Sequence, residues 1–116
     1  LQRLRLAWLG LGSDRRTQEL GPRRAFKQDR GQALALWRAD LKAWLDNTRR
    51  QVRQGGRVAI VIGDGHAGSR PLDSLAAIES AAGGAGLRLI ARASGARPDA
   101  GPNVLRREHV VLLEIP

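Results

Sequence analysis

The stretch RVAIVIGDG (residues 57–65) decides the fold that this sequence predicts. Five apolar residues, four of them β-branched, follow one another without the alternation of a half-exposed strand. Such continuous runs are typical of strands that are buried on both faces, as in parallel sheets covered by helices. We therefore expect an interior parallel strand at residues 57–62, ended by a turn at Gly63–His66.

The residues before this strand predict a long amphipathic helix. From Gln32 to Gln54, apolar residues recur at intervals of three and four and form one stripe. Its members are Leu34, Trp37, Leu41, Trp44/Leu45, Thr48 and Val52. The pair Gly55-Gly56 is expected to end the helix, because glycine adopts the left-handed conformation of a helix end at low cost.

The residues after the strand predict a second helix and two more strands. Pro71 is expected to open the helix, with Asp73 in its first turn, and Gly83-Gly84 to close it. Strands are expected at Leu87–Ala93 and Glu108–Ile115, separated by a loop over residues 94–107. The last two strands can pair antiparallel across that loop.

The fold class is therefore α/β, in the order helix, strand, helix, strand, strand. A strand–helix–strand crossover is right-handed and is expected to place its two strands as parallel neighbours. The expected architecture is a partial doubly wound, Rossmann-like sheet with an antiparallel last strand. Helices are expected on each face, and one long sheet edge is left bare. We read residues 1–116 as a single partial domain, with a basic helix and loop lead-in at 1–31 and an α/β half-sheet unit at 32–116.

The net positive charge of the chain lies entirely in its first half. Of the net +9, residues 1–57 carry fourteen basic and five acidic side chains, and residues 58–116 carry six of each. This asymmetry favours a polyanionic partner, and nucleic acid is the first candidate. The alternative is that an arginine-rich composition alone raises the positive charge. The candidate contacts are Arg15, Arg16, Arg23, Arg24, Lys27, Arg97, Arg106 and Arg107.

Several classes of protein and site are excluded or disfavoured. The chain has no cysteine, so disulfides and thiolate metal sites are excluded. Its two histidines, His66 and His109, are far apart in the sequence, so we expect no metal site and a structural or surface role for each. No signal peptide or membrane-length apolar run is present, and we expect a cytoplasmic protein with no membrane partner. No self-contained catalytic constellation occurs, and no catalytic residue is assigned.

The candidate substrate cleft is formed by Gly63, Asp64 and Gly65. They follow the predicted buried strand, and ligands of open α/β sheets lie beyond the carboxyl ends of the strands. The alternative is a turn in which Asp64 only satisfies the amides of its own loop. Gly83-Gly84-Ala85-Gly86 is not read as a nucleotide loop, because it closes a helix and precedes a strand.

Taken together, these segments resemble the later half of Rossmann-type S-adenosylmethionine-dependent methyltransferases. The segments are WRADLKAWLDNTRRQVRQGGRVAIVIGDG, PLD, AGLRL and RREHVVLLE. The resemblance is to the DNA methylases and RNA guanine methylases that use an (Asp/Asn/Ser)-Pro-Pro-Tyr motif. It implies a long helix and Gly-Gly before the fifth strand, then a helix, the sixth strand and an antiparallel seventh strand. The opening LRLAWLGLGSDRRTQELGPRRAF resembles the segment that follows the Pro-Pro-Tyr motif.

The sequence departs from this family in two respects. The Gly-rich loop and the acidic residue that hold S-adenosylmethionine in the family are absent, and so is the Pro-Pro-Tyr tetrapeptide. Because the chain also begins at Leu1 rather than Met, we expect a fragment or split gene product that lacks the cofactor and catalytic half. Loop 94–107 is expected to face the substrate, and the isolated chain to associate with itself.

The first hypothesis is the C-terminal portion of an S-adenosylmethionine-dependent methyltransferase that acts on a base amine, in DNA rather than RNA. The fragment alone is expected to be inactive and to need its missing N-terminal half or a partner chain. One alternative is a non-enzymatic nucleic-acid-binding α/β module, and another is a subunit that completes its sheet with another chain.

Overall fold

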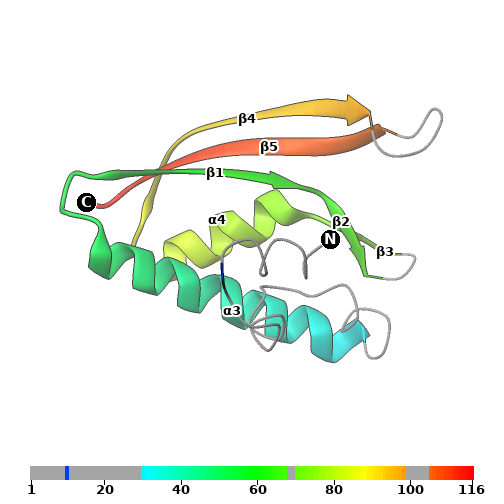
Figure 1. The fold of residues 1–116 in the computed structure, drawn as a ribbon, viewed down its shortest axis with the longest axis horizontal. Coiled ribbons are helices and arrows are strands. Elements are labelled where there is room, and N and C mark those ends of the chain that lie inside the picture. Colours follow the sequence, from blue (N-terminus) through cyan, green and yellow to red (C-terminus); the bar gives the residue numbers. More distant parts are fainter. Residues whose placement is uncertain (1–9, 11–29, 68–69, 99–104) are drawn as a thin grey trace.

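The computed structural model describes residues 10, 30–67, 70–98 and 105–116 (Figure 1). Two helices, α3 (Arg30–Gln51) and α4 (Ser74–Gly84), accompany five strands. The strands are β1 (Arg57–Gly63), β2 (Gly65–Ala67), β3 (Arg70–Leu72), β4 (Arg88–Pro98) and β5 (Leu105–Glu114). The α/β class and the predicted order of the larger elements are confirmed. The predicted lead-in at 1–31 lies almost wholly outside the described residues.

The main sheet has three strands in the order β1-β5-β4, and both of its pairings are antiparallel. The predicted parallel pairing of β1 is therefore wrong, and among the described residues β1 lies at an edge of this sheet rather than in its interior. The interior position belongs to β5, which lies between the two strands joined by α4. Since β1 and β4 both run antiparallel to β5, they run in the same direction without being neighbours. The predicted antiparallel pairing of the last two strands is confirmed.

Both helices cover the same face of the sheet, on its lower side in Figure 1. The prediction of helices on each face is thus wrong for the described residues. Between helices and sheet lies one apolar core, to which the second helix, the last strand and the turn after α4 all contribute. Its buried members are Leu41, Leu45, Ile60, Ile78, Ala82, Ala85, Leu87, Val111, Leu113 and Ile115.

The apolar stripe of α3 meets this core as predicted. Leu41 and Leu45 are buried, and Trp37 and Val52 pack against the core, whereas Trp44 is exposed. The helix ends at Gln51, so Gly55 does not cap it. Instead, Gly55 takes its positive φ of 74° in the turn that leads into β1. A side chain at Gly56 would collide with Val52 and the Arg53 carbonyl, so the turn needs both glycines.

A short hairpin replaces the predicted turn and helix start between β1 and α4. β2 pairs antiparallel with β3, and Pro71 lies in β3 opposite His66 rather than opening the helix. Asp73 is the N-cap of α4, and its carboxylate accepts a hydrogen bond from the Ala76 amide at 2.9 Å. The predicted end of α4 at the glycine cluster is confirmed, since Ala85 is the C-cap and Gly86 has φ of 71°.

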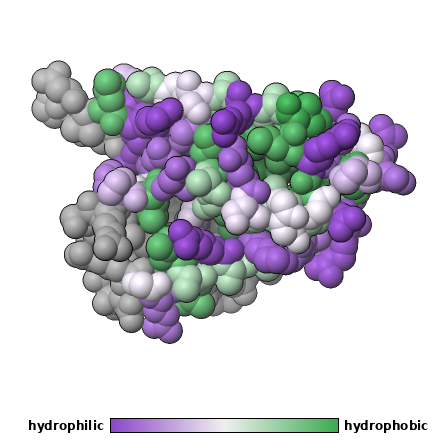
Figure 2. Space-filling view, turned by 180° about the vertical axis from the view of Figure 1, so that it is seen from behind, coloured by the Kyte–Doolittle hydropathy of each residue, from purple (hydrophilic) through white to green (hydrophobic). Residues whose placement is uncertain are grey.

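The other face of the sheet is uncovered by any described element. Val61 of β1 lies opposite Val110 of β5, and both are exposed. Leu112 of the central strand β5 lies opposite Ala59 of β1 on one side and opposite Ala91 of β4 on the other. In Figure 2, which views the molecule from behind with this face at the top, hydrophobic and charged side chains both occur along the upper margin. The apolar run of β1 therefore has two apolar faces, as the sequence indicates, but only one is buried.

Candidate functional site

The three predicted cleft residues lie together where β1 ends. Gly63 is the last residue of β1, Asp64 follows it, and Gly65 begins β2. The Asp64 amide donates to the Arg107 carbonyl of β5 at 2.9 Å, which continues the β1–β5 ladder by one step. We call residues 63–65 the β1 tip.

The Asp64 carboxylate binds two donors from other elements. His109 Nε2 of β5 lies 2.9 Å from Oδ1, and the Ser74 amide at the start of α4 donates to the same oxygen at 3.2 Å. The Ser74 hydroxyl in turn donates to the Gly63 carbonyl at 3.0 Å. These bonds tie the β1 tip to the N-terminus of α4, where the helix dipole favours a negative charge.

His109 extends this network of hydrogen bonds to β4. It is only 3% exposed, and its Nδ1 lies 2.7 Å from the Ser94 hydroxyl. In the tautomer that carries its proton on Nε2, the ring donates to the Asp64 carboxylate, and Nδ1 accepts a hydrogen bond from the Ser94 hydroxyl. Both ring nitrogens then have partners, which removes the cost of burying a polar ring without hydrogen bonds.

The hydrogen-bonded series Ser94, His109 and Asp64 resembles a catalytic triad, but the local structure around the serine differs. Ser94 lies inside the regular ladder of β4, directly opposite His109, and not in a sharp turn beside amide donors. The network joins β1, β4, β5 and α4 around one buried ring. We therefore assign it the role of fixing the β1 tip.

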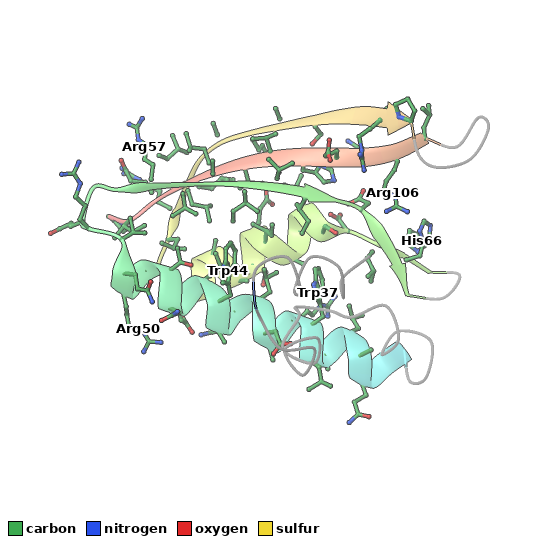
Figure 3. The ribbon with its side chains drawn as sticks, viewed as in Figure 1. Trp37, Trp44, Arg50, Arg57, His66 and Arg106 are labelled. Atoms are coloured by element: carbon green, nitrogen blue, oxygen red, sulfur yellow. The ribbon has the colours of Figure 1, made fainter. Side chains whose placement is uncertain are left out.

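Three of the predicted nucleic-acid contacts lie in the β4–β5 hairpin. Arg97 is directly opposite Arg106, and its Nε lies 3.5 Å from the Glu108 carboxylate. Arg106 lies at the same end of the molecule as His66 and the β1 tip (Figure 3). Arg107 is exposed and follows Arg106 in β5. The structure thus brings the predicted cleft and these arginines to one end, whereas Arg15, Arg16, Arg23, Arg24 and Lys27 lie outside the described residues.

A groove of about 1140 Å³ runs between α3 and α4 and reaches Leu72, which pairs with Gly65 of the β1 tip. Trp37, Leu34 and the alanines of α4 form its apolar walls, and Arg38 and Lys42 line it as well. Lys42 is already paired with Asp46 at 2.7 Å. Among the residues that the structure describes, none of the predicted site residues lines this groove.

The described residues do not fit S-adenosylmethionine. The β1 tip leads into a strand, so its amides do not open a helix as a nucleotide loop would. Asp64, its one acidic side chain, is engaged by His109 and Ser74. Within the described ranges, no group of three or more His, Asp or Glu side chains is arranged to hold a metal ion.

No protein-family model matches this chain, and neither does any curated protein or any solved structure. In the described part of the chain, neither helix has the length and apolar character that crossing a membrane requires.

Sequence reasoning missed Ser74 and Ser94, and it did not connect His109 with Asp64. One signal was available for His109. It alternates with Val111 and Leu113 along the last strand, which places all three side chains on one face. Nothing in the sequence places Ser94 opposite it, because that register depends on the β4–β5 pairing.

Proposed function

We propose that this chain is the later part of an S-adenosylmethionine-dependent methyltransferase that modifies an exocyclic base amine, in DNA rather than RNA. One observation carries the proposal: apart from the β2–β3 hairpin between β1 and α4, the elements α3, β1, α4, β4 and an antiparallel β5 occur in the order that the family resemblance implies. The cofactor would supply the methyl group and would be held by polypeptide outside these residues.

The open sides of the sheet support the same proposal. The outer edge of β1 carries no strand among the described residues, and the face that holds Val61 and Val110 carries no helix. In a doubly wound sheet, further strands and a second layer of helices fill these places. β1 is apolar on both faces, as a strand inside such a sheet requires.

The β1 tip would then form one wall of the substrate cleft. It lies at the carboxyl end of β1, where open α/β sheets bind their ligands. The bonds from Asp64 to His109 and Ser74 hold this wall in place. Catalysis in such an enzyme consists mainly of positioning the amine against the methyl donor, so a fixed wall is useful.

The test has a genetic and a biochemical part. The coding sequence upstream of residue 1 is expected to encode an (Asp/Asn/Ser)-Pro-Pro-Tyr tetrapeptide in the same frame. The complete product is expected to transfer label from [methyl-³H]-S-adenosylmethionine to DNA, whereas the 116-residue chain alone transfers none. An upstream frame without the tetrapeptide, together with no transfer to DNA or RNA, would refute the proposal.

The open edge of β1 also favours a second candidate, a subunit that completes its sheet with a different chain. Affinity purification of the tagged chain from its own cells is then expected to recover one partner in a fixed ratio. Recovery of the chain alone as a monomer would count against this candidate.

A further inference from the structure

Four arginines lie at the end of the molecule opposite the β1 tip. Arg49 and Arg50 belong to the last turn of α3, Arg53 follows that helix, and Arg57 begins β1. All four are exposed, and residues 47–57 contain no acidic side chain. We call these residues the α3-end cluster.

The turn between α3 and β1, which carries Arg53 and leads to Arg57, is fixed to the residue after β5. Gly55 donates to the Ile115 carbonyl at 2.8 Å, and Ile115 donates back to Gly56 at 2.9 Å. The chain is thereby anchored to the end of the central strand before Arg57. Arg50 and Arg57 both project outward at this end of the molecule (Figure 3).

Nearby acidic side chains do not neutralise the positive charge of the cluster. Glu114 lies opposite Arg57 in the sheet, but its carboxylate is bound by Arg88. None of the four cluster arginines has an acidic partner among the described residues. The nearest carboxylates in the sheet and on α3, those of Glu114 and Asp46, are thus paired with Arg88 and Lys42.

A purely structural role accounts for only part of the cluster. Cations near the C-terminus of a helix interact favourably with its dipole, which applies to Arg49 and Arg50. Arg49 also packs over the turn after α4, since a Cβ at Gly86 would lie 3.0 Å from its Nη1. Arg53 and Arg57 lie beyond the helix, and neither of these reasons applies to them.

We propose that the α3-end cluster binds backbone phosphates of duplex DNA at a distance from the base held at the β1 tip. This inference rests on the proposed nucleic-acid function and adds a second contact region to it. Arg57 and Gly63 are six residues apart along β1, which at about 3.3 Å per residue is about 20 Å. At about 3.4 Å per base pair, phosphates about six base pairs from the target base would reach the cluster.

Salt-dependent binding of the full chain to a 20-base-pair duplex tests the proposal. Each phosphate contact steepens the fall of log K with log salt concentration by about 0.9. The double variant Arg50→Gln/Arg53→Gln is therefore expected to flatten that slope by about 1.8. The control is Lys42→Gln/Arg92→Gln, which removes the same charge from two cations that are already paired with Asp46 and Glu79.

The outcomes separate this inference from the function on which it rests. If the control flattens the slope as much as the cluster variant, net charge and not the cluster binds DNA, and the inference is wrong. If the wild-type chain binds the duplex and the cluster variant keeps its slope, the inference is also wrong, while the proposed function stands. If the wild-type chain shows no salt-dependent binding, the inference is wrong, while the proposed function is decided by the methyl-transfer test on the complete product.

Discussion

Asp64 lies at a junction rather than inside its own loop. An Asx-type turn would join its carboxylate to amides one or two residues away. Instead, that carboxylate accepts from Ser74, ten residues on, and from His109, forty-five residues on. It is the residue through which the end of β1, the start of α4 and the middle of the sheet are connected.

Replacing Asp64 is expected to lower the free energy of unfolding. In Asp64→Ala the buried His109 Nε2 and the Ser74 amide lose their acceptor, which costs about 1–3 kcal/mol. Asp64→Asn keeps an amide oxygen as acceptor, so we expect a smaller loss. Urea denaturation followed by circular dichroism measures both.

The matched control is Asp40→Ala, which removes an exposed carboxylate from the surface of α3. We expect this variant to lie within about 0.5 kcal/mol of the wild type. Equal stability of Asp64→Ala and Asp40→Ala would show that the network does not hold the β1 tip.

The sequence predicts which residues form the β1 tip but not what holds them. Gly63, Asp64 and Gly65 are recognisable because they follow an apolar β-branched run. Their partners lie on β4, β5 and α4, and only the pairing of distant strands brings them near. Register of this kind depends on the whole sheet and cannot be read from local spacing.

At the scale of elements, two glycines at the end of α4 differ in whether their backbone conformation requires glycine. Gly83 lies within the helix, and a Cβ there would meet nothing within 4 Å. Gly86 has φ of 71° and lies against the guanidinium of Arg49. Both belong to the same four-residue segment, which in the sequence is simply rich in glycine.

Alanine at these two positions is expected to change stability in opposite directions. Gly83→Ala should raise the free energy of unfolding by about 0.5–1 kcal/mol, because glycine weakens a helix by that amount. Gly86→Ala should lower it by about 1–2 kcal/mol, because an L-residue is strained in the left-handed region. Thermal unfolding of the two variants measures the difference, and the same sign for both would contradict this account of the helix end.

Element type is predicted well here, and element order in the sheet is not. The long helix, the second helix and the three larger strands follow from apolar spacing and glycine positions. The insertion of β5 between β1 and β4 does not follow, because a strand–helix–strand unit fixes the direction of its strands and leaves open what lies between them. The hairpin of β2 and β3 was missed because strands of three residues carry no detectable period.

At the scale of the molecule, charge and apolar surface are separated on the sheet. On the uncovered face, Arg88 and Glu114 pair at one end, and Arg97 and Glu108 at the other. Between these ends lie Val61, Val110 and Leu112 with the alanines beside them. Exposed apolar surface with a polar rim is typical of an interaction site.

The uncovered face is therefore expected to drive self-association of the 116-residue chain. Burial of apolar area on a second copy stabilises an assembly, while the charged ends stay in water. In the double variant Val61→Glu/Val110→Lys, two opposite charges replace the apolar pair at directly opposed positions. Such a cross-strand pair supports the sheet, so the fold should persist while association weakens.

Sedimentation velocity over a range of protein concentrations measures the effect. The wild-type chain should shift to larger species as concentration rises, and the double variant should remain monomeric over the same range. The control Leu105→Lys removes an exposed apolar side chain at the start of β5, on the opposite face to Val110, and should leave association unchanged. A wild-type chain that stays monomeric, or a control as effective as the double variant, would mean that this face drives no self-association.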